Sequence, residues 1–243
     1  KGELFDYLRT KSNATIFINN DNKYLTDIAQ DLNQIRYGAP QEHLPLRVSG
    51  EVIDCAPYLH FRWHMGNSAW NEVQTHLIGS YNIDNMMAAA TIGLYFGVTP
   101  SQINEALTEY IPRNNRSQLE HTPHNRLIID AYNANPTSMM AALKNFRDMD
   151  VTPKMAILGD MKELGECSMD EHQKIVSFLD ENKFDKVWLV GDQFTATSIS
   201  DKHRTFSHVN EVIQAIQEEE IHDFYILIKG SNSMKLAQTV PYL

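Results

Sequence analysis

The residue types best suited to chemistry in this chain stand directly after four apolar stretches in its second half. In chain order, the four polar ends are Asp130, Gly159-Asp160, Gly191-Asp192 and Lys229-Gly230-Ser231. Carboxylates can accept hydrogen bonds from sugar hydroxyls, and a lysine ammonium can pair with a phosphate or a carboxylate. One polar strand end is ordinary, because loops are solvated. Four such ends on one edge of a parallel sheet would instead form a ligand site.

The densest polar stretch spans residues 130–138, Asp-Ala-Tyr-Asn-Ala-Asn-Pro-Thr-Ser. Pro136 suits the first turn of a helix, so Asn135 is the expected N-cap, and the free amides beyond it can also face an anion. The carboxylate of Asp130 can accept two ribose hydroxyls, and we favour this role for it. Tyr132 is either a stacking surface or a packed aromatic residue, and the sequence leaves both open.

Other polar residues have weaker signals. Arg116 follows a predicted linker, where a guanidinium can reach a phosphate on a neighbouring domain, although the sequence alone favours a solvated linker arginine. Asn82 and Asn85 open a predicted helix, and their position does not decide between helix capping and contact with a base edge. Lys229 offers a point charge beside Gly230, at which the backbone can approach a ligand closely.

Several common nucleotide-binding and catalytic motifs are absent from the sequence. None of the eleven glycines precedes a lysine, so there is no phosphate loop of the form G-x-x-x-x-G-K-[ST]. The patterns G-x-G-x-x-G and G-x-S-x-G are absent as well. His60 and His64 form an H-x-x-x-H pair in a strand-like run, without the glutamate of a metalloprotease helix. We interpret them as packing or surface residues.

The elements that must position the polar ends form a regular pattern. Continuous apolar runs alternate with amphipathic helical stretches, which is typical of parallel strands covered on both faces. The expected strands are residues 127–129, 155–158, 187–190 and 225–228. The expected helices are residues 136–149, 169–182 and 209–219, with a capping box at 168–171 and a last helix after Ser233. This half is predicted to be doubly wound α/β.

The first half has a mixed pattern. Strands are expected at residues 15–19, 47–56, 58–65 and 72–78, and helices at residues 82–96 and 101–110. The longer helix has one apolar stripe, formed by Ile83, Met86, Met87, Ala90 and Leu94. A proline and two asparagines within residues 110–115 predict a domain boundary there.

Composition excludes some classes of protein. The chain has 243 residues, of which 42% are hydrophobic, enough for one large or two ordinary domains. Its net charge of -10 disfavours nucleic acid as a partner. The two cysteines, Cys55 and Cys167, are too few and too distant for a disulfide framework or a zinc ribbon. No apolar run approaches the roughly 20 residues that a membrane-spanning helix needs.

Four stretches, taken together, resemble the signature motifs of the Mur ligase family. They are residues 114–118, 130–138, 158–165 and 229–231. Within the family, D-A-Y-N-A-N-P-T-S and L-G-D-M-x-E-L-G are similar to the branch that joins D-alanyl-D-alanine to UDP-N-acetylmuramoyl-tripeptide. The resemblance covers nearly the whole chain.

The resemblance implies a domain arrangement. The family has a UDP-sugar domain, a central ATPase domain and a C-terminal Rossmann-like domain. Residues 1–111 would be the C-terminal part of the central α/β ATP-binding domain, without its phosphate loop. Residues 112–243 would be the complete C-terminal ligase domain, with a doubly wound, mostly parallel sheet. The abrupt start at Lys1, without an initiator Met, is interpreted as a cut fragment, which we expect to be inactive by itself.

The resemblance also implies roles for single residues. Those expected at the nucleotide are Asn82 and Asn85 near the adenine, Arg116 at the phosphates, Asp130 at the ribose, Tyr132, and Asn133 close to the phosphates. Of these, Arg116 and Asn133 are expected to act in catalysis. Residues expected to handle the incoming amino-acid substrate are Asp160, Lys162, Lys229 and Ser231. Lys1 falls where the family has a lysine that is carbamylated and bridges magnesium.

The implied reaction belongs to bacterial peptidoglycan synthesis in the cytoplasm. ATP, with Mg²⁺, converts the peptide carboxylate to an acyl phosphate, which the amine of D-alanyl-D-alanine attacks. Domain closure would bring Arg116 and Asp130 onto a nucleotide held by the upstream loop. We expect a monomer that binds neither nucleic acid nor membrane. The alternatives are another Mur or folylpolyglutamate-type ligase, against which the D-A-Y-N-A-N-P stretch argues, and a non-catalytic nucleotide- or peptide-binding module.

Overall fold

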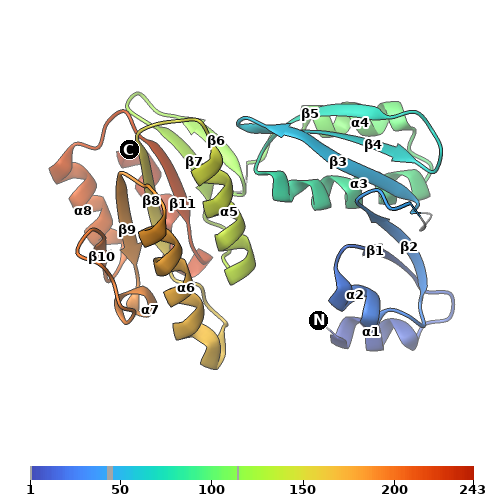
Figure 1. Ribbon diagram of the computed structural model, residues 1–243, viewed down its shortest axis with the longest axis horizontal. Helices are drawn as coiled ribbons and strands as arrows, with labels where there is room; N and C mark the ends of the chain where they lie inside the picture. The colour runs from blue at the N-terminus through green and yellow to red at the C-terminus, as the bar shows by residue number, and fades with distance from the viewer. Residues whose placement is uncertain (1, 43–45, 114) are drawn as a thin grey trace. The chain divides into compact units, whose positions relative to one another are not determined.

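The chain folds into two compact units, each with its own β-sheet (Figure 1). The computed structural model describes residues 2–42, 46–113 and 115–243. The first unit comprises the chain up to His76 together with Ser80–Tyr110, and the second comprises Leu77–Gly79 and Ile111–Leu243. Within the described part of the chain, every helix is too short or too polar to span a lipid bilayer.

The first unit is built on a mixed five-stranded sheet. Its elements are α1 (Gly2–Arg9), β1 (Thr15–Asn19), α2 (Lys23–Ile28), β2 (Asn33–Gly38), β3 (Val48–Cys55), β4 (Tyr58–Met65), β5 (Asn71–Ile78), η1 (Ser80–Asn82), α3 (Ile83–Tyr95) and α4 (Pro100–Glu109). The strand order is β1-β2-β3-β4-β5; β1, β2 and β3 run parallel, and β4 is antiparallel to β3.

Helix α3 packs on β1, β2 and β3 through the apolar stripe predicted from the sequence. Met86, Met87 and Ala90 of this stripe are buried. A Cβ atom at Gly50 of β3 would lie 2.3 Å from the sulfur of Met87, so a larger residue there would displace the methionine side chain. Helix α3 therefore packs closely against these strands.

The second unit is built on a six-stranded sheet in which only the edge strand β6 is antiparallel. Its elements are β6 (Gln118–His121), β7 (Arg126–Asp130), α5 (Pro136–Asp148), β8 (Lys154–Gly159), η2 (Gly165–Cys167), α6 (Ser168–Glu181), β9 (Lys186–Val190), α7 (Asp192–Thr195), β10 (Arg204–Phe206), α8 (Val209–Glu219), β11 (Tyr225–Lys229), η3 (Asn232–Met234) and η4 (Leu236–Tyr242). The strand order is β10-β9-β8-β11-β7-β6.

Helices cover both faces of this second sheet. Helices α5 and α6 lie on one face and α8 on the other (Figure 1). The α8 face is filled by apolar side chains from β7, β8, β9 and β11, including Trp188, together with Val212 and Ile216 of α8. Burial on both faces explains why these strands are continuous apolar runs. The predicted α/β class and the doubly wound, mostly parallel sheet are confirmed.

Two local predictions are wrong. Ser168 does not cap α6; it is the first residue of the helix, and its hydroxyl donates to Oε1 of Gln193 at 2.7 Å. The Ser168 hydroxyl therefore bonds to a residue distant in sequence instead of accepting a backbone N–H in the first turn of α6, as a capping box requires. The chain from Asn232 onward forms two 3-10 helices, not an α-helix, because Lys235 adopts a left-handed conformation with φ +55° between them.

Several short elements give no sequence signal strong enough to predict them. They are α1, α2, β2, β6, α7 and β10. Strand β2, for example, has the sequence Asn-Gln-Ile-Arg-Tyr-Gly, in which polar and apolar residues alternate over only four positions. It is a strand because β1 and β3 both pair with it in the sheet. The predicted helix 82–96 begins one residue later than expected, since Asn82 belongs to η1.

Candidate ligand site at the carboxyl edge of the second sheet

All four polar strand ends meet at one edge of the second sheet, since β9, which ends before Gly191-Asp192, pairs in parallel with β8, which ends before Asp160. Strand β11 lies between β7 and β8, and Lys229 pairs in register with Asp130 on one side and with Leu158 on the other. Asp160 follows the next residue of β8, and its carbonyl accepts the N–H of Ser231 at 3.1 Å. The carboxyl ends of parallel strands are the usual place for ligands in such sheets. The sequence prediction of a shared edge is confirmed.

Asp130 and Lys229 form a buried ion pair at the centre of this edge. Nζ of Lys229 lies 2.5 Å from Oδ2 of Asp130, and the lysine side chain is 1% exposed. Oδ1 of Asp130 accepts the backbone N–H of Ser117 at 3.3 Å, and Nζ of Lys229 also contacts the carbonyl of Asn133 at 3.4 Å. Each charge has its partner inside the protein. The Asp130 side chain is still 12% exposed, so its remaining lone pairs can accept a ligand hydroxyl.

Arg116 and Tyr132 form an exposed stack beside the ion pair. The guanidinium carbon of Arg116 lies 3.9 Å from the centre of the Tyr132 ring, within the range of a cation–π contact. The tyrosine is 46% exposed, and its backbone N–H donates to the carbonyl of Asn115 at 3.2 Å. Tyr132 is thus a stacking surface and not a packed core residue. Arg116 is held on that surface with its charge open to solvent.

The start of α5 follows the predicted capping pattern. Oδ1 of Asn135 accepts the N–H of Ser138 at 2.9 Å, and Oγ of Ser138 accepts the N–H of Asn135 at 3.1 Å. Asn135 is therefore the N-cap, as predicted, with Pro136 in the first turn. Oδ1 of Asn133 accepts the N–H of Ala134 at 2.8 Å. These bonds fix the loop that carries Tyr132 and Asn133.

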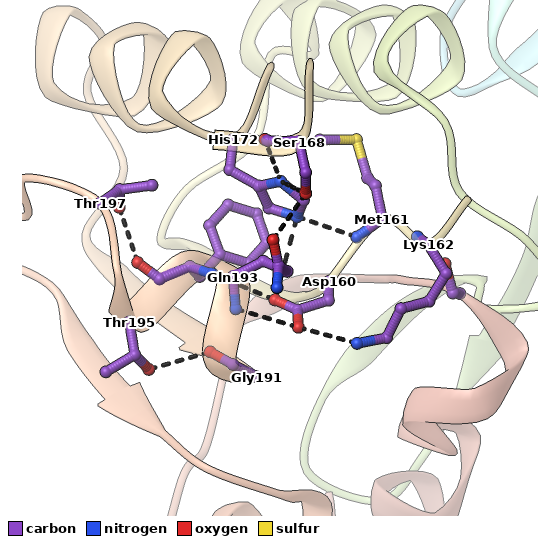
Figure 2. Close-up of polar contacts among 11 residues, drawn as sticks. Asp160, Met161, Lys162, Ser168, His172, Gly191, Gln193, Thr195 and Thr197 are labelled. Carbon is purple, nitrogen blue, oxygen red and sulfur yellow. Dashed lines mark hydrogen bonds and ion pairs between the residues drawn. The ribbon is translucent and has the colours of Figure 1, made fainter. Parts of the chain in front are cut away.

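Asp160 is a fully buried carboxylate that joins three segments (Figure 2). Oδ1 accepts the N–H of Phe194 at 3.1 Å, while Oδ2 accepts the N–H of Gln193 at 3.2 Å and contacts Nζ of Lys162 at 3.1 Å. Two amides and one ammonium therefore compensate the buried charge. The side chain of Asp160 faces this network and not solvent.

His172 is a buried residue of the same network that the sequence gives no signal to find. Its Nδ1 lies 2.7 Å from the carbonyl of Ser168, and its Nε2 accepts the N–H of Met161 at 3.0 Å (Figure 2). Nε2 is thus an acceptor and carries no proton, while Nδ1 is the donor. The 3.9 Å separation between Nε2 and Asp160 is therefore not an ion pair. His172 holds the residue that follows Asp160.

A cavity of about 420 Å³ opens next to Asp160. Its lining includes Lys162, Asp192, Lys235 and Gln238. The Lys162 side chain is 45% exposed, and the N–H of Lys162 donates to Oγ of Ser231 at 2.9 Å. Of the four residues expected to handle substrate, Lys162 is the accessible one, since Asp160, Lys229 and Ser231 are buried. Lys235 was not singled out by the sequence, because the loop after Ser231 resembles an ordinary helix start.

Asn82 and Asn85 lie in the first unit, at the start of α3. Nδ2 of Asn85 donates to Oδ1 of Asn82 at 3.2 Å, and Asn82 forms no side-chain cap of the helix. Asn82 is buried and Asn85 is exposed. The expected metal-bridging Lys1 lies outside the described residues. Among the residues that the structure describes, no three His, Cys, Asp or Glu side chains are arranged to hold a metal ion.

Comparison with known proteins identifies the group to which this chain is related. Residues 115–232 match the family described as "Mur ligase, glutamate ligase domain". The chain belongs to the Mur ligase family. The Mur ligase motifs predicted from the sequence, at residues 130–138, 158–165 and 229–231, therefore lie on one sheet edge of a family member.

Individual Mur ligases give the extent of the similarity. UDP-N-acetylmuramoyl-tripeptide–D-alanyl-D-alanine ligase of Bacillus subtilis is 32% identical over 173 residues, which cover 68% of this chain and 38% of that protein. A crystal structure of MurF from Acinetobacter baumannii has a TM-score of 0.80 at 22% identity, covering 99% of this chain and 53% of that one.

A second solved structure extends the likeness in fold. MurF ligase from Thermotoga maritima in complex with ADP has a TM-score of 0.78 at 17% identity, covering 96% of this chain and 53% of that one. At these identities the solved structures establish the fold alone. The chain spans about half of the length of these Mur ligases, or less.

Proposed function

We propose that the protein to which this chain belongs is an ATP-dependent ligase that joins D-alanyl-D-alanine to UDP-N-acetylmuramoyl-tripeptide in bacterial peptidoglycan synthesis. The observation that carries the proposal is the shared sheet edge, where the motif residues Asp130, Lys162 and Lys229 meet within a member of the Mur ligase family. The Bacillus subtilis relative bears the name of this activity, which supports the choice of substrates.

The residues of the second unit fit an adenine nucleotide. Arg116 presents an exposed guanidinium, which suits a phosphate, and the Asp130 carboxylate, on a side chain that is 12% exposed, suits ribose hydroxyls. Tyr132 offers an exposed ring face beside them. When bound, ATP supplies the phosphoryl group that activates the peptide carboxylate as an acyl phosphate. The ADP complex of the Thermotoga maritima MurF ligase is consistent with this choice.

The roles of the site residues follow from their exposure. Arg116 would contact the phosphates and stabilise developing negative charge, since a fixed cation costs little reorganisation during the reaction. Asn133, whose carbonyl contacts Lys229, would stand close to the same phosphates. Lys162 would bind the incoming amine substrate from the cavity rim, with Ser231 holding its backbone. Asn82 and Asn85 would stand near the adenine. Lys1 would serve Mg²⁺ only if it is carbamylated.

The same proposal assigns the two parts of the chain. Residues 1–111 would belong to the central ATP-binding domain and residues 112–243 would form the C-terminal ligase domain. We place the protein in the cytoplasm, because the reaction that we propose uses soluble nucleotide-linked precursors. We also expect a monomer.

The test is a coupled assay of the complete protein with ATP and UDP-N-acetylmuramoyl-tripeptide. We expect ADP release and a product heavier by one dipeptide less water when D-alanyl-D-alanine is the amine. Parallel reactions contain D-alanine alone, L-glutamate alone, or a folate with L-glutamate. Turnover with one of these but not with the dipeptide would assign another ligase, and nucleotide binding without any turnover would indicate a binding module.

A matched pair of linker arginines sharpens this assay. Arg116→Ala should lower kcat by about a hundredfold, as expected when a cation that stabilises transferred phosphoryl charge is removed. Arg113→Ala removes another exposed arginine of the same linker and should leave kcat within about twofold of the wild type. Equal losses in the two variants would mean that linker charge in general, and not Arg116, supports turnover.

A further inference from the structure

Lys162 is anchored at both of its ends. Its backbone N–H donates to Oγ of Ser231 at 2.9 Å, and its Nζ lies 3.1 Å from Oδ2 of Asp160. Between these anchors the side chain runs along the rim of the 420 Å³ cavity and remains 45% exposed. A lysine side chain loses conformational entropy when it is fixed, so such an arrangement needs a strong partner.

The side chain of Asp160 is itself fixed by its contacts. Its carboxylate accepts two backbone amides, those of Gln193 and Phe194, at the start of α7 (Figure 2). A Cβ atom at Gly191, which has φ +119°, would lie 2.4 Å from the carboxyl carbon of Asp160. The next residue, Met161, is fixed by His172 through its N–H. The carboxylate is therefore a rigid, fully buried negative charge directly behind the Lys162 ammonium.

The same cavity contains a lysine without such an anchor. Lys235 lines the cavity and is exposed, and within residues 2–42, 46–113 and 115–243 its Nζ has no hydrogen bond or ion pair. The two lysines therefore differ in preorganisation. The ammonium of Lys162 is held at the cavity rim by Asp160, whereas the side chain of Lys235 is free to move. This difference is what a ligand-positioning role for Asp160 requires.

We propose that Asp160 is a positioning residue that acts through Lys162. It presets the Lys162 ammonium at the cavity rim, where the ammonium binds the carboxylate of the incoming amine substrate. This inference rests on the proposed function for the identity of that substrate, a dipeptide with a free C-terminal carboxylate. Asp160 itself does not touch the substrate.

A kinetic test uses Asp160→Asn, Lys162→Met and the double variant of the complete protein. Asparagine keeps the size of the side chain but lacks the charge that attracts Lys162. We expect each single variant to raise KM for D-alanyl-D-alanine by about tenfold, with KM for ATP within about twofold of the wild type. The double variant should match Lys162→Met, because Asp160 has nothing left to position.

Two kinetic outcomes overturn the inference. One is an effect of Asp160→Asn that persists in full in the Lys162→Met background, which would show that Asp160 acts independently of Lys162. The other is an unchanged KM for the dipeptide accompanied only by a lower melting temperature, which would make Asp160 purely structural. If the wild type does not use D-alanyl-D-alanine at all, the proposed function fails, and the positioning role is decided by the second measurement.

The second measurement needs no turnover, and its first comparison is made within the wild type. The complete wild-type protein is treated briefly with acetic anhydride, and acetylation of Lys162 and Lys235 is followed by mass spectrometry. Lys162 must leave Asp160 before its amine can attack the reagent, so we expect it to react several-fold more slowly than Lys235. In Asp160→Asn the two rates should converge. Equal rates in the wild type would overturn the inference.

Discussion

At the scale of single residues, the site is governed by two buried carboxylates with different partners. Asp130 pairs with one buried lysine, whereas Asp160 takes two amides and a half-exposed lysine. Removing a charge from water is costly, and each carboxylate is stable only because its compensating groups are fixed close by. The first arrangement locks Lys229 into the fold, and the second leaves Lys162 accessible to a ligand.

The buried pair predicts a large stability effect. Lys229→Met should lower the free energy of unfolding of the second unit by about 3–5 kcal/mol, because it leaves Asp130 buried without its counter-charge. Lys235→Met, at an exposed lysine of the same sheet edge, is the matched control and should cost no more than about 0.5 kcal/mol. Urea unfolding, combined with hydrogen exchange of the β7 and β11 amides, measures both.

A further variant separates the charge from the packing of this pair. Adding Asp130→Asn to Lys229→Met should recover part of the lost stability, since a neutral amide is cheaper to bury than an unpaired carboxylate. A double variant with a lower free energy of unfolding than Lys229→Met would instead mean that the two side chains contribute through packing alone.

At the scale of elements, the strands β3, β4 and β5 are joined by a histidine between two carboxylates. Nδ1 of His60 lies 2.9 Å from Oδ2 of Asp54, and Nε2 lies 2.8 Å from Oε1 of Glu72. Both bonds require a proton on both ring nitrogens, so the imidazolium is favoured. The hydrogen bond to Asp54 is the main reason why the pKa of His60 is raised, and the bond to Glu72 adds to it against partial desolvation.

This arrangement predicts a pH-dependent contribution to stability. Because the pKa of His60 is higher in the folded chain than in the unfolded chain, the stabilisation is fully present below the unfolded value, near 6.5, and is lost as pH rises through the folded value. His60→Gln should therefore destabilise the first unit at pH 5.5 more than at pH 8.5. Thermal unfolding at the two pH values measures this difference.

His64 provides the matched control on the same strand. Its Nδ1 lies 2.7 Å from the carbonyl oxygen of Gly66, where His60 has a carboxylate oxygen. His64→Gln gives the effect of removing a histidine from the same strand, and the pH dependence of His60→Gln should exceed that of His64→Gln. A pH-independent effect of His60→Gln would mean that the imidazolium does not form, and that the carboxylates are bridged in another way.

At the scale of the whole chain, the groups that we propose to face the nucleotide lie in a polypeptide that lacks a phosphate-binding loop sequence. Backbone amides of such a loop, together with its lysine, hold the phosphates in loop-containing ATPases.

We therefore expect the 243-residue chain to bind ATP at least about a hundredfold more weakly than the complete protein, and to release no ADP. Isothermal titration calorimetry and an ADP-release assay of both proteins provide the comparison. Ligase turnover by these 243 residues would contradict the proposal.

Much of the second sheet was predictable because its strands are buried on both faces, which produces continuous apolar runs. The short strands β2, in the first sheet, and β10, in the second, could not be predicted. Pairing with neighbouring strands stabilises them, whereas their own sequences give only a weak strand signal. The same limit applies to the Ser168 hydroxyl, which bonds to Gln193, 25 residues away, instead of capping its own helix.

The sequence by itself determined the alternation of strands and helices, the N-cap at Asn135, and the polar residue types at the strand ends. Only the tertiary structure decided that Asp130 and Lys229, 99 residues apart in the chain, form a buried pair, and that Lys162 alone of its group is accessible. The physical reason is the insertion of β11 between β7 and β8. Local patterns specify which residues end a strand, whereas burial and pairing depend on which strand becomes its neighbour.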